Sequence, residues 1–247
     1  MKTIKYIALL ILILISQMVL AQTKQMVESF DKVIISPHIE TTLVQGDEES
    51  VTILDNTEPE DKINIEVNKN TLRVYLDDAK ETTKHEKVII DGIERKMPIY
   101  KGKVLTILIT YKSIETLSLR GEQRTFCQSL IEAEKFKLYI YGESQVTFND
   151  VNIDTFNVDI YGESELIIKK GTTVKQNITA YGSGIINLVD VDNKSSKLKA
   201  YGEAVFKIQA SKSIKFTAYG EATLRHKGEA EVNKGLSFGD SEIRRID

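Results

Sequence analysis

A three-residue block with glycine at its centre recurs seven times in the second half of the chain. The central glycines are separated by 21, 20, 20, 20, 18 and 19 residues. A fixed period near twenty residues is typical of a solenoid, in which each repeat forms one coil stacked on the previous one. The blocks are Arg120-Gly121-Glu122, Tyr141-Gly142-Glu143, Tyr161-Gly162-Glu163, Tyr181-Gly182-Ser183, Tyr201-Gly202-Glu203, Tyr219-Gly220-Glu221 and Phe238-Gly239-Asp240.

The residues around each glycine indicate strands. Apolar residues stand two and four positions before the glycine, as in Leu138 and Ile140, and a mostly polar residue separates them. This period-two alternation predicts a strand with one buried face, and it resumes four and six positions after the glycine. The glycine between the two strands allows a bend or a positive φ. The residue two positions after it is small, as a tight inner corner requires: Ser144, Ser164, Gly184, Ala204 and Ala222.

We therefore predict an all-β fold, a single-stranded right-handed parallel β-helix (β-solenoid) with about 20 residues per coil and an irregular N-terminal β cap. The right hand is expected because parallel crossovers almost always have it. With about 4.8 Å between neighbouring strands, six intervals correspond to a rod section of roughly 29 Å.

The same phase places the residue before each glycine on the outer face. Stacked coils would then align a ladder of tyrosines beside a ladder of glutamates that is broken by Ser183. Like charges on neighbouring strands repel by roughly 0.2–1 kcal/mol per pair, so the glutamates must be solvated, paired with lysines or bound to cations. A row of tyrosines stabilises a sheet face, and it also offers an apolar strip with hydroxyls to a sugar or a protein. The candidate ligand-binding residues are Tyr141, Tyr161, Tyr181, Tyr201, Tyr219, Glu143, Glu163, Glu203 and Glu221.

Residues 1–21 have the pattern of a secretory signal peptide. Two lysines precede an apolar run over residues 7–15, and Val19-Leu20-Ala21 provides the cleavage position. The run is shorter than the roughly 20 residues of a membrane-spanning helix. Residue 22 is glutamine rather than the cysteine of a lipid anchor, and no later stretch is apolar enough to span a bilayer. We expect an exported mature chain, in the periplasm or at the cell surface.

Charge and composition exclude several classes of function. The formal net charge of the chain is −3, which becomes −5 without the two leader lysines, whereas a nucleic-acid partner would require a basic face. Cys127 is the only cysteine, so no intrachain disulfide can form, and we expect it to be buried. The histidines, expected at the surface, show no metal-ligand spacing, and no nucleophile motif is present. They are His38, His85 and His226.

Residues 22–116 are less regular, and we predict an N-terminal β region with the first coils. Residues 77–103 are charge-rich at first and then contain Asp91-Gly92 between apolar residues, which suggests either an insertion with a small hairpin or a disordered loop. Residues 105–110 are expected to lead into the first repeated coil. Other expected strands cover residues 30–35, 39–44 and 51–54, with a hairpin of 63–67 and 72–76.

Residues 117–247 are predicted to form the regular solenoid repeats and a C-terminal cap. Leu236 and Phe238 fall out of phase with the apolar residues of the earlier coils, as expected of a closing cap. Two acidic clusters, 150–154 and 190–193, recur at one offset from their glycines and could offer oxygens to calcium. The intervening coil has Lys169 and Lys170 there, so we expect solvated turns, no metal and no cofactor.

Several segments together resemble a known family. They are Phe30-Asp31-Lys32-Val33, Val44-Gln45-Gly46-Asp47-Glu48-Glu49, Leu72-Arg73-Val74 and the glycine blocks from Gly121 onward. Over residues 28–240 the chain resembles the putative autotransporter adhesin head domain, the GIN domain of exported bacterial proteins. The resemblance implies a β-solenoid head and no known enzymatic activity.

We predict an exported, non-enzymatic binding or structural module at the bacterial cell envelope. It would contact a cell-surface glycan or an envelope protein through the Tyr/Glu ladder, and a homo-oligomer is a further possibility. The alternative is a polysaccharide-acting enzyme of the parallel β-helix type that uses outer-face carboxylates about 5–9.5 Å apart. A catalytic pair is singular, whereas these glutamates recur in nearly every coil, which favours an architectural origin.

Overall fold

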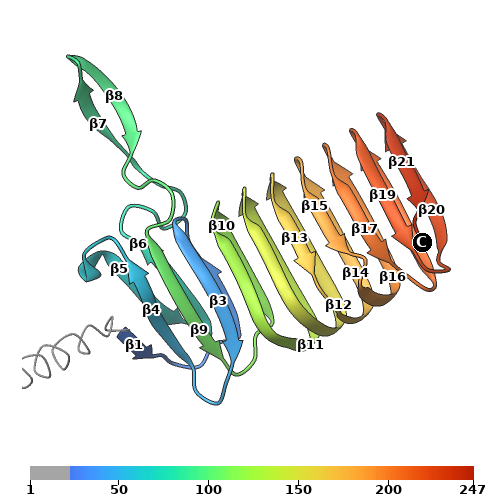
Figure 1. The fold of residues 1–247 in the computed structure, drawn as a ribbon, viewed down its shortest axis with the longest axis horizontal. Helices are drawn as coiled ribbons and strands as arrows, with labels where there is room; N and C mark the ends of the chain where they lie inside the picture. Colours follow the sequence, from blue (N-terminus) through green and yellow to red (C-terminus); the bar gives the residue numbers. More distant parts are fainter. Residues whose placement is uncertain (1–22) are drawn as a thin grey trace, which may run out of the picture.

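The computed structural model describes residues 23–247, and the predicted signal peptide lies outside them. The described chain forms a rod of stacked β-coils with one hairpin projecting from it (Figure 1). The fold is therefore the predicted β-solenoid. Its regular part contains β10 (Thr116–Gly121), β11 (Arg124–Gly142), β12 (Gln145–Gly162), β13 (Glu165–Ile168), β14 (Gly171–Tyr181), β15 (Ile185–Leu188), β16 (Val191–Tyr201), β17 (Val205–Gln209), β18 (Ser213–Tyr219), β19 (Ala222–Lys227), β20 (Glu231–Phe238) and β21 (Ser241–Arg245).

Each regular coil contributes to two parallel sheets that meet at the repeated glycine. The entry sheet is made of the strand segments that end at the glycines, and residues 116–121, 137–142 and 157–161 pair there in register. The exit sheet is made of the segments that follow the glycines, such as 145–148 paired with 165–168. A short return segment, such as residues 151–153, leads to the next coil. The 18-residue spacing before Gly220 arises at the return segment, where Ser211 and Lys212 complete the turn between β17 and β18.

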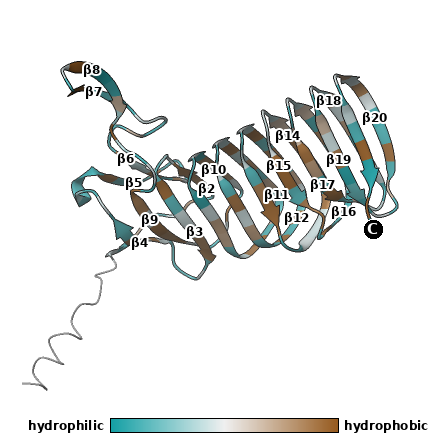
Figure 2. Cartoon of the chain, turned by 45° about the horizontal axis from the view of Figure 1, so that its top comes forward, coloured by the Kyte–Doolittle hydropathy of each residue, from teal (hydrophilic) through white to brown (hydrophobic). Residues whose placement is uncertain are grey.

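One apolar column runs through the rod. Within β12 the burial alternates residue by residue, with Val146, Phe148, Phe156 and Val158 almost inaccessible to solvent. The same alternation appears as bands of apolar residues across successive strands (Figure 2). Burial of this column supplies the main stabilisation of the fold, because apolar area removed from water contributes roughly 25 cal/mol per Å². Cys127 lies in this core, as predicted.

The N-terminal section is ordered differently along the rod. On the entry sheet, β2 pairs with both β6 and β10, and on the exit sheet β3 pairs with both β9 and β11. The first coil is therefore built from β6 and β9, and an earlier stretch of chain, β2 and β3, forms the second. This section contains β1 (Thr23–Met26), β2 (Lys32–Ile35), β3 (Ile39–Gln45), β4 (Ser50–Asn56), η1 (Glu60–Lys62), β5 (Ile63–Asn68), β6 (Thr71–Leu76), β7 (His85–Ile90), β8 (Ile93–Pro98) and β9 (Leu105–Tyr111).

Chain order and stacking order differ here. Residues 105–110 lead along the chain into β10, as expected, but β3 lies between β9 and β11 in the exit sheet. Antiparallel strands close this end of the rod: β4 pairs with β9, β1 pairs with β4, and β5 pairs with β6. The predicted hairpin of residues 63–67 and 72–76 is the β5–β6 pair.

Residues 77–104 connect β6 to β9. Ala79, Tyr100 and Val104 at the two ends of this segment pack into the core, and β7 and β8 between them form an isolated hairpin (Figure 1). Its turn is Asp91-Gly92, and both residues have positive φ. The hairpin predicted at this turn is confirmed, with residues 85–90 paired to residues 93–98.

The last coil continues the parallel stack. β20 pairs with β18 and β21 with β19, and the register shifts where Gly235 and Leu236 stand opposite Thr217. This bulge explains why Leu236 and Phe238 are out of phase with the core. Both side chains are largely exposed, at 70% and 63%.

Candidate functional site

The repeated glycines stand in one file along the corner between the entry and exit sheets. Gly162 has a φ of +118°, and a Cβ atom built on it would lie 2.3 Å from the carbonyl oxygen of Gly142. No side chain fits at such a distance, so a coil can approach the carbonyl oxygen of the preceding corner this closely only if it carries glycine at this position. Inside this corner, the hydroxyl groups of Ser144 and Ser164 each donate a 2.8 Å hydrogen bond to a glycine carbonyl of the preceding coil. The predicted inner corner of small residues is confirmed.

The glycine file fixes the tyrosine ladder beside it. The rings of Tyr141, Tyr161, Tyr181, Tyr201 and Tyr219 stack with centroids 4.8 to 5.1 Å apart and planes within 3° to 7° of parallel. Phe238 continues the stack at 5.8 Å and 18°. Between 36% and 39% of each tyrosine is exposed. Stacked carbon atoms touch at about 3.5–4 Å, so rings this far apart must be offset and present edges and hydroxyl groups outward.

The ladder changes character at Arg120, where the sequence block has arginine in place of tyrosine. The Arg120 guanidinium lies over the ring of Tyr141, 5.3 Å from its centroid. Glu81, from the segment that leads to the projecting hairpin, forms ion pairs with both Arg120 and Arg73. Burial lowers the pKa of Arg120, and the neighbouring charge of Arg73 lowers it further. Arg120 nevertheless stays protonated at neutral pH, because its ordinary pKa is far above 7.

The glutamates occupy the other side of the glycine corner. Glu143, Glu163, Glu203 and Glu221 are exposed, and within residues 23–247 none of them forms an ion pair. Of the three arrangements considered for this ladder, pairing with lysines is thus not observed in the described chain. The same residues contain no group of three or more His, Cys, Asp or Glu side chains that could hold a metal ion. The glutamate file is an exposed acidic edge beside the tyrosines.

Asp159 lies next to the middle of the ladder on the outer side of the entry sheet. Burial raises its pKa, and the Thr179 hydroxyl and the charge of Lys199 partly counteract this effect. Burial also raises the pKa of Tyr161, and the carboxylate of Asp159 adds to it. The hydroxyl of Tyr161 therefore stays protonated, and able to donate hydrogen bonds, well above neutral pH.

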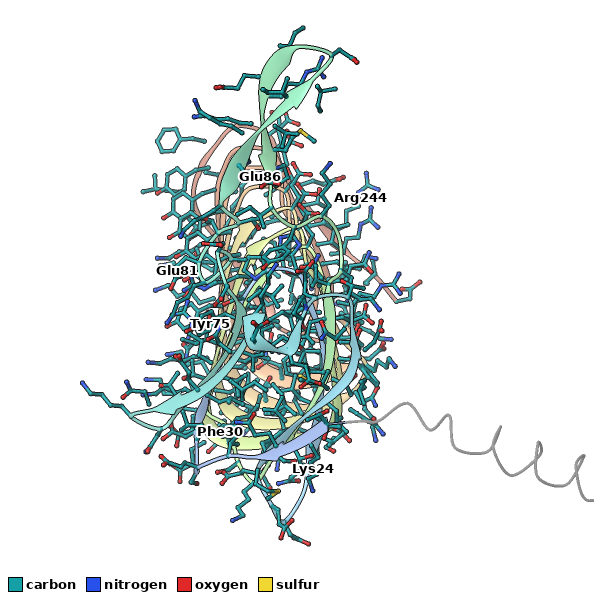
Figure 3. All side chains as sticks on the ribbon, turned by 90° about the vertical axis from the view of Figure 1, so that its left-hand side faces the viewer. Lys24, Phe30, Tyr75, Glu81, Glu86 and Arg244 are labelled. Carbon is teal, nitrogen blue, oxygen red and sulfur yellow. The ribbon has the colours of Figure 1, made fainter. Side chains whose placement is uncertain are left out.

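A pocket of about 410 Å³ lies at the Arg120 end of the ladder. Its walls come from three distant parts of the chain: Pro37 and His38 between β2 and β3, residues 81–83 of the hairpin stem, and residues 120–123 with Tyr141 and Gly142. Figure 3 shows Glu81 and Tyr75 on the same side of the rod. The sequence predicted the ladder but not this pocket, and its one local signal is Arg120 in the tyrosine position of the block.

A second group of residues was also not predicted. Buried side chains between β14 and β16 form a closed ring of four hydrogen bonds. Thr173 donates to Asn193 (3.1 Å), Asn193 to Ser196 (2.8 Å), Ser196 to Gln176 (3.1 Å) and Gln176 to Thr173 (3.0 Å). Each of the four side chains has its hydrogen-bond partners within the ring, so the ring is a satisfied polar layer between the two coils.

The histidines differ from the expectation that all three lie at the surface. His226 is buried, and burial lowers the pKa of its imidazole. The ring of His38 makes two 2.6 Å hydrogen bonds, with the carbonyl oxygen of Gly102 and the hydroxyl of Thr83. In the acidic clusters, Asp150 pairs with Lys170, and Asp192 accepts a hydrogen bond from Gln209. Residues 23–247 include no helix with the length and apolar character needed to cross a membrane.

Comparison with known families agrees with the stacked coils and their glycine corner. The model of the putative auto-transporter adhesin, head GIN domain, matches residues 29–230. The chain belongs to the GIN domain family. Among curated proteins, none matches this GIN domain chain.

Several solved structures share this fold. A putative adhesin from Bacteroides fragilis has a TM-score of 0.75 and 17% identity, and the match covers 91% of the GIN domain chain and 96% of the adhesin. A putative adhesin from Parabacteroides merdae has a TM-score of 0.65 and 15% identity, with coverage of 92% and 96%. A putative lipid binding protein from Parabacteroides distasonis has a TM-score of 0.62 and 16% identity, with the same coverage. At these identities the likeness concerns the fold alone.

Proposed function

We propose that this GIN domain is an exported, non-enzymatic binding module of the cell envelope, whose tyrosine ladder contacts a cell-surface glycan. The observation that carries the proposal is the regular stacking of five half-exposed tyrosines at 4.8 to 5.1 Å. The family description and the names of the structural neighbours support an adhesin-like role.

The ladder is suited to binding because its rings are already ordered. Immobilising a flexible side chain at an interface costs about 0.5–1.5 kcal/mol, and rings fixed by their neighbours avoid most of this cost. Their exposed edges offer C–H groups, and their hydroxyls can donate and accept hydrogen bonds. Within residues 23–247 these five hydroxyls are not engaged in hydrogen bonds with other side chains or the backbone. A glycan presents the matching combination of apolar C–H faces and hydroxyl groups.

An enzymatic role is not supported by a distinct pair of carboxylates. Glu143, Glu163, Glu203 and Glu221 have equivalent positions on equivalent coils, and each lies on a solvated edge. Acid–base chemistry requires two groups in different environments, one held protonated and one ionised. A repeated edge of this kind suits recognition, where many equivalent weak contacts along an extended ligand add together.

A glycan array probed with wild type and the Tyr161→Ala/Tyr201→Ala variant tests the proposal. We expect the variant to bind about tenfold more weakly, because each lost aromatic contact costs on the order of 1 kcal/mol or less. The matched control is Ile167→Ala/Val205→Ala, which removes two half-exposed residues from the outside of the exit sheet. Equal glycan binding by the two double variants would exclude the ladder as the contact surface. If the wild type binds no glycan but retains an envelope protein, the partner of the ladder is a protein and not a glycan.

A further inference from the structure

We infer that the pocket at the Arg120 end of the tyrosine ladder, the end pocket, binds the terminal residue of a neutral glycan chain. The preceding sugar units would lie along the ladder, so the inference rests on the proposed function and adds a specificity for chain ends. It follows from the geometry of the pocket walls, the charges that line them and the position of the pocket on the ladder.

The hairpin stem closes the ladder at this end. Val74, Ile35 and Leu119 are paired on three neighbouring strands. The next residues along the chain are Tyr75, Ser36 and Arg120. Arg120 pairs with Tyr141, so the three residues continue the tyrosine file toward the N-terminal end of the rod. The stem packs over this file, since the Ser36 hydroxyl donates a 2.6 Å hydrogen bond to the carbonyl oxygen of Lys80. Arg73 donates to the same oxygen at 2.9 Å. A ligand that follows the tyrosines therefore meets protein at Glu81 and cannot continue.

The opposite wall of the pocket is fixed by His38. Its ring nitrogens bind Thr83 on the outgoing part of the stem and Gly102 on the returning part, both at 2.6 Å. Its backbone N–H donates a 2.7 Å hydrogen bond to Gln123 at the glycine corner. One residue thus holds the hairpin stem and the first regular corner together, and the pocket is formed before a ligand arrives. Preformed walls lower the cost of binding.

The chemistry of the lining favours a polyhydroxyl ligand without charge. Arg120 and Glu81 neutralise one another, and Arg73 supplies a second positive charge behind them. Glu122 is exposed at the pocket and balances that charge with a carboxylate that can accept hydrogen bonds from a pair of hydroxyls. Thr82 adds a hydroxyl, and the edge of Tyr141 adds an apolar contact. An anionic sugar would lie beside the Glu122 carboxylate and find no unpaired positive charge, because Glu81 already pairs with both arginines.

The test is a titration of the mature chain with neutral monosaccharides, followed by backbone amide NMR. Glucose, galactose, mannose and N-acetylglucosamine are added to about 50 mM, well above a millimolar dissociation constant. At least one is expected to shift the amides of Gly121, Glu122 and Gly142, while glucuronic and galacturonic acids shift them less. Glu122→Ala should weaken the response about tenfold. Glu134→Ala, which removes an exposed glutamate outside the pocket lining, is the matched control and should leave it unchanged.

The outcomes separate this inference from the proposed function. Absence of shifts at these three amides with every neutral sugar, or an equal response of the two glutamate variants, overturns the end pocket and leaves the ladder untouched. A stronger response to the uronic acids also overturns it. Shifts that persist in Tyr161→Ala/Tyr201→Ala, together with a ladder that binds no glycan, uphold the pocket as a sugar site and reject the proposed function.

Discussion

The regular coils and the N-terminal section use the same alternating strands but obey different stacking rules. From β10 onward the coils stack in chain order and every pairing is parallel. Before β10 the first and second coils are exchanged along the rod, and antiparallel strands cover the outer edge. The difference shows what the repeated glycine does. Where it is present, neighbouring coils stack in chain order and in register, and where it is absent, the stacking order departs from the chain order.

The two ends of the rod differ accordingly. At the N-terminal end β4 and β5 run antiparallel to the first coil and satisfy its strand edges. In the described part of the other end, β20 and β21 have strand partners on one side only. Unpaired strand edges are sites of association, and here the bulge at Gly235 and the charged residues of β21 interrupt the edge.

The largest loss of stability in the regular section is expected when one corner glycine is replaced by a residue with a side chain. Gly162→Val places a branched side chain where even a Cβ lies 2.3 Å from a backbone oxygen, at a φ of +118°. We expect a loss of about 3 kcal/mol or more in the free energy of unfolding, because backbone strain and a clash within the stack act together. Urea denaturation of the mature chain measures it.

Gly184→Ala is the matched control within the same file of corners. Gly184 stands at the small inner position, where other coils carry serine or alanine, and an added Cβ meets its nearest atom at 3.4 Å. This variant should unfold within about 0.5 kcal/mol of wild type or be slightly more stable. Similar losses for the two glycine variants would show that the file does not determine the stacking.

The next largest effect is expected from the buried polar ring. Asn193→Ala removes the acceptor of the Thr173 hydroxyl and the donor to Ser196, which leaves buried polar groups without partners. Each such group costs about 1–3 kcal/mol, so we expect roughly 2 kcal/mol by urea denaturation. Thr172→Ala removes an exposed hydrogen bond to Asn152 from the adjacent position and should cost far less. Equal losses would mean that water satisfies the broken ring.

How far the sequence predicted the structure depends on the section. In the regular section, period-two alternation and glycine spacing together determine which residues face inward, so the files of Gly162 and Tyr161 could be predicted residue by residue. In the N-terminal section, β2, β6 and β9 have similar alternation and no shared block, so nothing local specifies which of them are neighbours. Their order depends on contacts between distant segments, which no local pattern records.

The polar ring and the end pocket escaped prediction for related reasons. Thr173 and Asn193 are polar residues in a return segment, a place where polar residues normally face solvent, and only the pairing of neighbouring coils reveals that they are buried. The end pocket joins His38, Thr83 and Arg120, which are far apart in the chain. Periodicity predicts contacts between residues one repeat apart. It does not predict the burial of polar residues in the ring, or the contacts between distant segments that form the end pocket.

The junction between the two sections should respond to alkaline pH. Cys127 pairs with Leu43 across it, and burial raises the pKa of the Cys127 thiol. A raised folded pKa contributes stability that is complete below the unfolded pKa, about 8.5, and is lost as pH rises toward the folded value. The free energy of unfolding should therefore fall by about 2 kcal/mol between pH 8.5 and 10, at roughly 1.4 kcal/mol per pH unit.

The Cys127→Ala variant separates this effect from other titrations. Its stability should be lower near neutral pH, but the steep decline between about pH 8.5 and 10 should be absent, since no thiol ionises on unfolding. Above about pH 10 the buried hydroxyl of Tyr111, whose pKa burial also raises, makes both proteins lose stability. Parallel pH profiles for wild type and variant, measured by denaturation, would contradict burial of the thiol at the junction.

The smallest effect is expected from removal of the projecting hairpin, which belongs to the N-terminal section. β7 and β8 pair only with each other in the described chain, so their strands add no rung to the rod. His85 and Pro98 are cross-strand partners, and a two-residue Gly-Gly link can therefore replace residues 86–97 without moving the stem. We expect the free energy of unfolding to change by less than about 0.5 kcal/mol, as for surface changes away from the core.

The same replacement tests whether stem and hairpin have separate roles. Glu81 and Thr83 remain, so the end pocket should keep its response to neutral sugars even though the hairpin is gone. A loss of more than about 2 kcal/mol would instead show that the hairpin helps to hold the exchanged coils in place. In that case the stacking order of the N-terminal coils would depend on the insertion, whereas the regular coils stack without any such element. The two sections would then differ more than their strand pairings alone indicate.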